Sequence, residues 1–171
     1  MENNSELSTQ HGTTQTLASP ALDTQLEEQL CAQIETAHNT GNLLAVVSME
    51  LNNPDLFNDT PGTHGVDKVL HTVEECLQAV QSDGDITTRY GDAGFIALLP
   101  NSDAHDALEV CSRIAANIDK RPYQSSSGRE IPIGLSFGAA IFPHDGNTLH
   151  DLLAVASSNL DEARRGSVSS N

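Results

Sequence analysis

The sequence has few basic residues, and this scarcity restricts its partners. Only 8 Lys and Arg residues stand against 24 Asp and Glu residues in a chain of 171, and the formal net charge is −16. A basic surface for nucleic acid or an anionic membrane is therefore excluded. The same charge repels nucleotide phosphates, so a phosphate site would depend on a metal ion or on particular Lys and Arg side chains.

Cysteines and long apolar runs are also scarce. Cys31, Cys76 and Cys111 are far apart, odd in number and without CxxC spacing. Each lies in a helical apolar pattern, so we expect three small core residues in a reduced protein. The sequence shows no signal peptide and no transmembrane run, and we expect a soluble, cytoplasmic chain without membrane insertion.

Several common catalytic signatures are missing. There is no Walker-type loop and no dinucleotide-binding glycine fingerprint. The serines at 125–127 have no paired base, which argues against a nucleophilic triad. His64, Asp67 and His71 could lie on one helix face as metal ligands, but a zinc site needs a fourth ligand or a water. We favour a solvated helix face for these three residues.

The length fits one domain with a sizeable core. Residues 1–18 are rich in Asn, Ser, Thr and Gln, and we predict a disordered polar arm there. The folded domain is expected over 19–166, with Ser19 and Pro20 starting its first helix. Residues 167–171 are predicted to form a flexible tail.

Apolar residues recur at helical spacing in segments that alternate with strand-like runs. Helices are predicted from Ser19 to Asn39 and over 66–80, 104–118 and 149–163, and strands over 43–51, 86–88, 95–99 and 131–142. The helix over 104–118 has a predicted apolar stripe of Ala104, Leu108, Cys111, Ala115 and Ile118. This order predicts an α/β domain whose helices cover a mixed sheet.

The segment 89–95 joins two of the predicted strands. A Gly-Asp-Ala-Gly cluster over 91–94 separates a β-branched run from an apolar run that ends at Pro100. This pattern predicts a β-hairpin, whose glycines permit a close approach of another backbone or a ligand.

Several segments taken together resemble the diguanylate cyclase (GGDEF) domain, over roughly residues 20–166. The matching residues are Asn58-Asp59, Asp67, Arg89-Tyr90-Gly91, Phe95, Leu135 to Ala140 and Phe142 to Gly146. The resemblance implies a mainly antiparallel central sheet wrapped by helices, as in the catalytic core of nucleotidyl cyclases. In active members of that family, two GTP molecules on two domains condense to cyclic di-GMP by metal-assisted phosphoryl transfer.

The resemblance places the five signature positions at Gly91, Asp92, Ala93, Gly94 and Phe95. The family's two signature carboxylates are thereby replaced by Ala93 and Gly94, which can neither coordinate a metal nor take a proton. Glu50 stands for the metal-binding Asp at the end of the first strand. Asn52 stands for the second acid there. We therefore expect no metal site, with Glu50 as its vestige.

Other positions of the resemblance concern the nucleotide. Asn58 and Asp67 match the family's guanine-reading pair, and Arg164 stands where the last helix usually has a phosphate-binding Lys. Asp55 replaces another Lys with the opposite charge. The product-inhibition motif Arg-x-x-Asp aligns with the segment 82–85, in which Asp85 remains and the Arg does not, so bidentate recognition is lost.

We therefore expect a catalytically inactive GGDEF-like domain without a cofactor. Its expected role is that of a regulatory, protein-interaction module in bacterial cyclic di-GMP signalling. Its partners would be cyclic di-GMP enzymes or receptors, or a second copy of the chain. One alternative is a sensor that binds GTP, with Mg²⁺, through Asn58 and Asp67 without turnover. A further alternative is a residual cyclase that uses Glu50 and Asp92 as metal ligands; it ranks last because lost charge stabilisation is costly.

Overall fold

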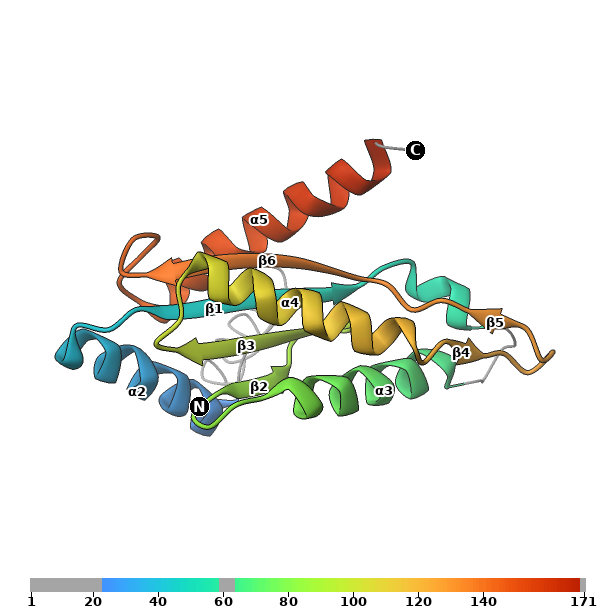
Figure 1. The fold of residues 1–171 in the computed structure, drawn as a ribbon, viewed down its shortest axis with the longest axis horizontal. Helices are drawn as coiled ribbons and strands as arrows, with labels where there is room; N and C mark the ends of the chain where they lie inside the picture. The colour runs from blue at the N-terminus through green and yellow to red at the C-terminus, as the bar shows by residue number, and fades with distance from the viewer. Residues whose placement is uncertain (1–22, 59–63, 170–171) are drawn as a thin grey trace, which may run out of the picture.

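The structure is a computed structural model, and it describes residues 23–58 and 64–169. The elements in chain order (Figure 1) are α2 (Thr24–Thr40), β1 (Leu44–Leu51), the short 3-10 helix η1 (Pro54–Phe57), α3 (Gly65–Val80), β2 (Ile86–Arg89), β3 (Gly94–Pro100), α4 (Ala104–Asp119), β4 (Tyr123–Gln124), β5 (Glu130–Ile131), β6 (Leu135–Phe142) and α5 (Leu149–Ser169). This order confirms the predicted α/β class. The predicted disordered arm and the helix start at Ser19 and Pro20 lie outside the described residues.

The central sheet is antiparallel, with strand order β2-β3-β1-β6. β1 lies inside it because residues 44–49 are all buried and can face helices on both sides. Near the end of β1, Glu50 lies between Gly94 on β3 and Ser136 on β6. The register therefore brings the segment 91–94 to the same edge as the end of the first strand.

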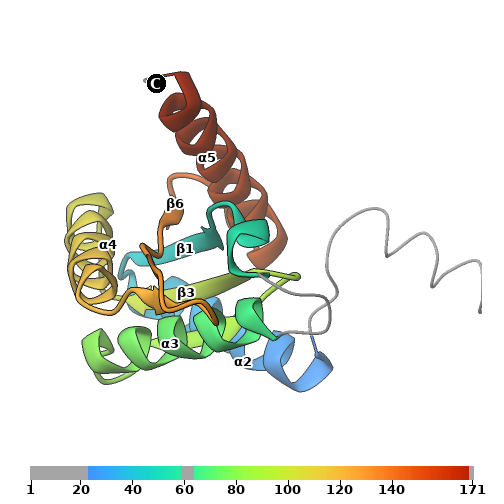
Figure 2. The same cartoon turned by 90° about the vertical axis from the view of Figure 1, so that its right-hand side faces the viewer.

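Helices cover both faces of the sheet, as Figure 2 shows. α3 and α4 pack on one face, where Val69, Val73 and Ile114 join Val47 and Met49 of β1 in the larger core. α2 and α5 pack on the other face, where the smaller core forms. The main residues of the smaller core are Leu30, Ile34, Val46, Leu98, Leu152 and Ala156. The alternation of side chains along β1 thus feeds two separate cores.

The outer edge of β6 is protected by side chains. The Asn159 side-chain amide of α5 donates to the Ala139 carbonyl over 2.8 Å, and the Ile141 N–H donates to the Asp145 carboxylate over 2.7 Å. α5 reaches this strand closely because Gly138 leaves room for the helix backbone. These bonds cover backbone groups that would otherwise be open to pairing with another chain.

Side-chain caps start two of the helices, α4 and α5. Asp103 caps α4 in a reciprocal pair with Asp106, and this bonding holds the pKa of the Asp103 carboxyl below its usual value. At α5, the Thr148 hydroxyl accepts from the Asp151 N–H over 3.1 Å. α5 continues to Ser169, beyond the predicted domain limit at residue 166. Among the described residues, none of the helices has the length and apolar content that crossing a bilayer requires.

Two predictions about buried residues were wrong. Leu108 was placed in the α4 stripe but is 65% exposed, because the buried side of α4 is formed by Ala107, Cys111, Ile114 and Ile118. Cys31 was expected in the core but is exposed, since it lies one residue past the inward stripe of Leu30 and Ile34. Cys76 and Cys111 are buried as predicted, and burial raises the pKa of the Cys111 thiol to about 11.

The segment between α4 and β5 contains a short strand, β4, that the sequence did not indicate. β4 pairs with β5 in a small antiparallel sheet, Tyr123 opposite Ile131. The Tyr123 ring packs edge-on against Phe57, with 5.5 Å between ring centroids. This small hairpin therefore supports the end of η1.

Candidate functional site

The signature hairpin closes directly onto the end of β1. Its turn contains Gly91 at φ 75°, a left-handed conformation that glycine adopts without strain. The Tyr90 N–H donates to the Gly94 carbonyl over 2.9 Å, and the Leu51 N–H donates to the Ala93 carbonyl over 2.8 Å. The predicted hairpin is confirmed, and its tip is bonded to the strand that carries Glu50.

Ala93 and Gly94 are part of the packed structure of this site. Ala93 is half-buried against the larger core. Gly94 is buried, and a Cβ atom there would lie 2.6 Å from the Met49 carbonyl oxygen and 2.9 Å from that of Tyr90. Because both neighbours are backbone atoms, a side chain at position 94 requires the hairpin to move away from β1.

Glu50 lies opposite Gly94 in the strand register, and it is already paired. The Arg164 guanidinium of α5 donates to the Glu50 carboxylate over 2.7 Å, and both side chains are about 40% exposed. Two residues that the resemblance assigned to different ligands, metal and phosphate, thus bind each other. Both residues were candidates from the sequence, but their pairing was not predicted. The available signal was the four-residue spacing from Leu160, which puts Arg164 on the inward side of α5.

Asn52 also has a partner within the protein. The Ser136 hydroxyl of β6 donates to the Asn52 side-chain carbonyl over 2.7 Å, and the Asn52 N–H donates to the Gly134 carbonyl. These bonds fasten the segment after β1 to the start of β6. Asn52 therefore serves to join strands in this structure.

These residues do not fit a Mg²⁺ site. Mg²⁺ needs oxygen ligands, usually carboxylates, in near-octahedral geometry. Positions 93 and 94 supply none, Glu50 is paired with Arg164, and Asp92 is exposed at the turn. Over residues 23–58 and 64–169, no group of three or more His, Cys, Asp and Glu side chains could hold a metal ion. His64, Asp67 and His71 are exposed, in line with the favoured interpretation of a solvated helix face.

Asn58 and Asp67 follow two backbone positions that are in close contact. The Phe57 carbonyl packs so tightly on Gly65 that a Cβ atom at position 65 would overlap it. Asn58 is exposed, and its N–H bonds to the Asp55 carbonyl. Asp67 is exposed in the first turn of α3 and lies 3.5 Å from His64. The structure thus brings the segments of both residues together and leaves both side chains accessible.

Asp85 is bonded within its own turn. Its carboxylate accepts from the Ser82 N–H over 2.9 Å, and its N–H donates to the Ser82 carbonyl. Burial raises the pKa of the Asp85 carboxyl, and the bond from Ser82 partly offsets this. The Asp that remains from the product-inhibition motif therefore closes the turn between α3 and β2.

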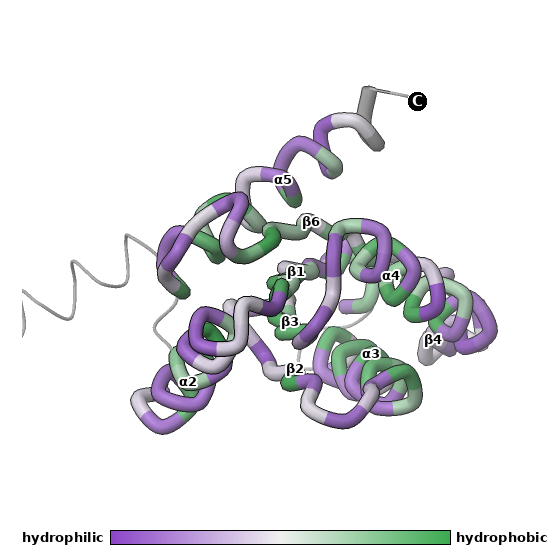
Figure 3. The backbone as a smooth tube through the Cα atoms, turned by 60° about the vertical axis from the view of Figure 1, so that its left-hand side comes forward, coloured by the Kyte–Doolittle hydropathy of each residue, from purple (hydrophilic) through white to green (hydrophobic). Residues whose placement is uncertain are grey.

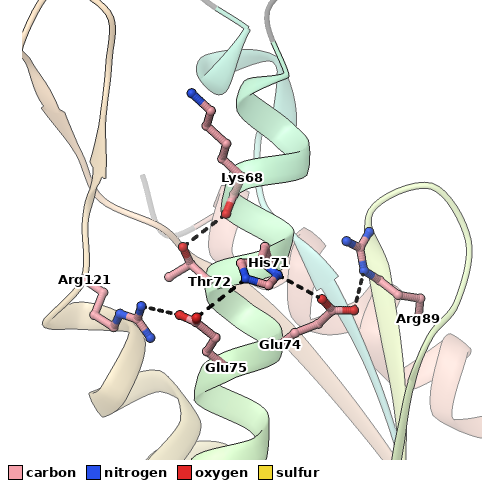
Figure 4. A network of polar contacts seen from close by, with 7 residues as sticks. All are labelled: Lys68, His71, Thr72, Glu74, Glu75, Arg89 and Arg121. Atoms are coloured by element: carbon pink, nitrogen blue, oxygen red, sulfur yellow. Dashed lines mark hydrogen bonds and ion pairs between the residues drawn. The ribbon is translucent and has the colours of Figure 1, made fainter.

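A polar network on α3 links it to two other elements (Figure 4). Glu74 pairs with Arg89 of β2 over 3.0 Å, Glu75 pairs with Arg121 after α4, and His71 lies 3.6 Å from each glutamate. The bond and charge of Arg121 lower the pKa of the Glu75 carboxyl. Arg89 also lies over the Phe95 ring, with its guanidinium carbon 5.6 Å from the centroid. The framing residues of the signature hairpin thus tie it to α3.

Comparison with known proteins gives a consistent result. Residues 23–169 match the family model described as diguanylate cyclase, GGDEF domain. The sequence is 30% identical over 145 residues to MucR of Pseudomonas aeruginosa, a bifunctional diguanylate cyclase/cyclic di-GMP phosphodiesterase; the match covers 82% of this chain and 21% of MucR. It is 29% identical over 110 residues to the diguanylate cyclase DosC of Escherichia coli, covering 64% of this chain and 24% of DosC.

A solved structure shows the same fold. The GGDEF domain of YfiN (TpbB) from Pseudomonas aeruginosa aligns with a TM-score of 0.77 at 26% identity, over 86% of this chain and 92% of that domain. The match with MucR and DosC covers about a quarter or less of their length. The similarity to these curated relatives therefore concerns one domain of each.

Proposed function

The chain belongs to the diguanylate cyclase GGDEF domain family, and within it we propose that this is a catalytically inactive member. Its role would be that of a regulatory, protein-interaction module in bacterial cyclic di-GMP signalling. The named relatives that make or degrade cyclic di-GMP support the pathway. The site residues support the loss of activity.

The pairing of Glu50 with Arg164 carries the proposal. A cyclase needs metal-bound charge where the phosphoryl group is transferred, because positioned cations neutralise the charge that develops there. Here the remaining acid at the end of β1 is neutralised by a side chain of the same molecule at 2.7 Å. The packing at Gly94 adds a second obstacle, since it leaves no room for a side chain at that position.

The test of inactivity is incubation of the chain with GTP and Mg²⁺, followed by chromatographic analysis of products. We expect no cyclic di-GMP. A Glu50→Gln variant is the matched control for contaminating cyclase, because a contaminant would give the same product with either protein. Product made by the natural chain and lost in Glu50→Gln would show a residual cyclase and contradict the proposal.

The regulatory role needs a separate measurement. Cyclases and phosphodiesterases encoded in the same genome would be assayed with increasing amounts of the chain. We expect the rate of at least one of them to change and then level off as the chain saturates it. Rates that stay constant throughout would contradict regulation through these enzymes.

A GTP-binding sensor without turnover is the second candidate. It is favoured by the contact between Phe57 and Gly65, which brings the segments of Asn58 and Asp67 together with both side chains accessible. Calorimetry with GTP and Mg²⁺ tests it, using Asp67→Asn as the site variant and Glu109→Gln on the exposed side of α4 as the charge-matched control. Binding lost only in Asp67→Asn would favour the sensor. No heat of binding at millimolar GTP would remove it.

A further inference from the structure

A groove lies at the opposite end of the sheet from the signature hairpin. α2 and the start of α5 enclose an open pocket of about 450 Å³. Its lining consists of Cys31, Ile34, Glu35, His38, Asn147, Thr148 and Leu149. The register shows the separation, because Leu44 at the first end of β1 pairs with Phe142, just before the α5 segment, whereas Glu50 pairs with Gly94. We call this pocket the α2/α5 groove.

The inner part of the groove is apolar. Ile34 and Leu149 form its base and are each 7% exposed. Cys31 is exposed on one wall, and slight desolvation of its thiol, together with the charge of Glu27, raises the pKa of that thiol. The volume is in the range of pockets that take several apolar groups. The groove can thus accept large apolar side chains from outside.

The helix that forms one wall carries acidic side chains but no Lys or Arg; its one histidine, His38, also lines the groove. The first Lys or Arg in the whole sequence is Lys68, so α2 has carboxylates, at Glu27, Glu28 and Glu35, and no permanent cation. All three are exposed, and Figure 3 shows hydrophilic residues along much of α2. None of the ion pairs within 23–58 and 64–169 involves these glutamates. The wall therefore presents unpaired negative charge next to an apolar base.

We propose that the α2/α5 groove binds a basic amphipathic helix of a partner protein. Apolar side chains of such a helix would fill the groove, as in other helix-in-groove complexes, and its Lys or Arg residues would face Glu27, Glu28 and Glu35. A second copy of this chain would bring the same acidic α2 and be repelled. The segment before α2 contains Glu2 and Glu6 and no Lys or Arg, so it is not complementary either. This inference rests on the proposed interaction role and assigns a surface to it.

The first experiment uses a synthetic peptide of about 18 residues, roughly five helical turns, with Leu on one face and Lys on the other. Binding to the whole chain is followed by fluorescence anisotropy, without GTP or metal. One control peptide scrambles the same residues so that the Leu face is lost, and another replaces each Lys by Gln. We expect the amphipathic basic peptide to bind at least about tenfold more tightly than either control.

Charge reversal on the protein locates the site. Glu35→Lys and Glu109→Lys change the net charge equally, but Glu35 lines the groove and Glu109 lies on α4, across the sheet. We expect the dissociation constant to rise roughly fivefold in Glu35→Lys and to change little in Glu109→Lys. Both positions are exposed, so folding should be preserved. Equal weakening in both variants would mean that the peptide only senses the overall charge, and would overturn the proposal.

Cys31 reports occupancy directly. In the folded chain it is the exposed cysteine, whereas Cys76 and Cys111 are buried. Alkylation at mildly alkaline pH should be slowed by the bound basic peptide and not by the scrambled one, and prior alkylation should weaken binding. Unchanged alkylation rates would overturn the groove as the site, and equal binding of the Gln peptide would overturn its preference for basic segments. Neither result bears on the assay for cyclic di-GMP. A failure of the groove proposal can therefore be distinguished from a failure of the proposed inactivity.

Discussion

Gly138 and Gly94 are two buried positions where the backbone approaches too closely for any side chain. At Gly138 on β6, a Cβ atom would lie 2.2 Å from the Ala156 carbonyl oxygen and from the Leu160 N atom of α5. At Gly94 on β3, it would lie 2.6 Å from the Met49 carbonyl oxygen. The packing requirement is similar at the two sites, although one lies under a helix and the other in the signature hairpin.

The difference lies in what each glycine stands for in the family resemblance. Gly138 belongs to a segment that agrees with the family pattern, and it allows α5 to cover the sheet. Gly94 stands where that pattern has a glutamate, and the hairpin is closed around its missing side chain. Close packing at Gly138 serves the fold, whereas at Gly94 it opposes a catalytic carboxylate. The proposed loss of activity is thus compatible with a scaffold that keeps its packing at Gly138.

The largest effect is expected for Gly138→Val. Backbone atoms of α5 lie within 2.2 Å of the new Cβ, so the helix has to move off β6, and we expect a loss of about 3–5 kcal/mol in the free energy of unfolding. Urea denaturation measures it. Gly166→Ala on the same helix is the control, because no atom lies within 4 Å of a Cβ there; it should be neutral or stabilise by up to about 1 kcal/mol. A mild loss in Gly138→Val would show that α5 adapts easily.

Gly94→Ala should cost less, about 1–3 kcal/mol, because a hairpin tip yields more readily than a packed helix. The double variant Ala93→Asp, Gly94→Glu restores the family's acids, and we expect it to make no cyclic di-GMP in the product assay. Glu50 remains paired with Arg164, and the hairpin must open to admit the new side chains. Robust product from the double variant would show that the two missing acids were the sole defect.

Much of the scaffold could be predicted from the sequence because it depends on local patterns. The run over 43–51 predicted the central strand, and the glycines around 91–94 predicted the hairpin between β2 and β3. The predicted buried face of α4 was wrong at Leu108. Helical spacing fits two sets of residues equally well, 104, 108 and 111 or 107, 111 and 114, and tertiary packing decides which set is buried. The pairing of Glu50 with Arg164 could not be predicted from local patterns, because the two residues are 114 positions apart in the sequence.

The pair of Glu50 and Arg164 should contribute little to stability although it occupies the site. Both side chains are about 40% exposed, so we expect a coupling of about 0.2–1 kcal/mol in a double-mutant cycle of Glu50→Gln and Arg164→Gln. Urea denaturation at low and high salt measures it, and the coupling should shrink with salt. A coupling that stays the same at high salt would contradict an ion pair between two exposed side chains.

The smallest effect is expected at Asp85, another family position that now serves the fold. Burial raises the pKa of its carboxyl above the unfolded value, so between the two pKa values the folded chain binds more protons. The contribution of the Asp85 carboxyl to the free energy of unfolding therefore falls as the pH rises from the unfolded pKa through the folded pKa, and it stays lower at higher pH. Asp85→Asn can still accept the bond from the Ser82 N–H and removes this penalty, so the variant should gain stability relative to the natural chain as the pH rises. Thermal unfolding across the acidic pH range measures this gain in stability. Asp83→Asn, in the same turn, is the control for a lost charge. An equal gain in Asp83→Asn would attribute the effect to net charge rather than to burial of Asp85.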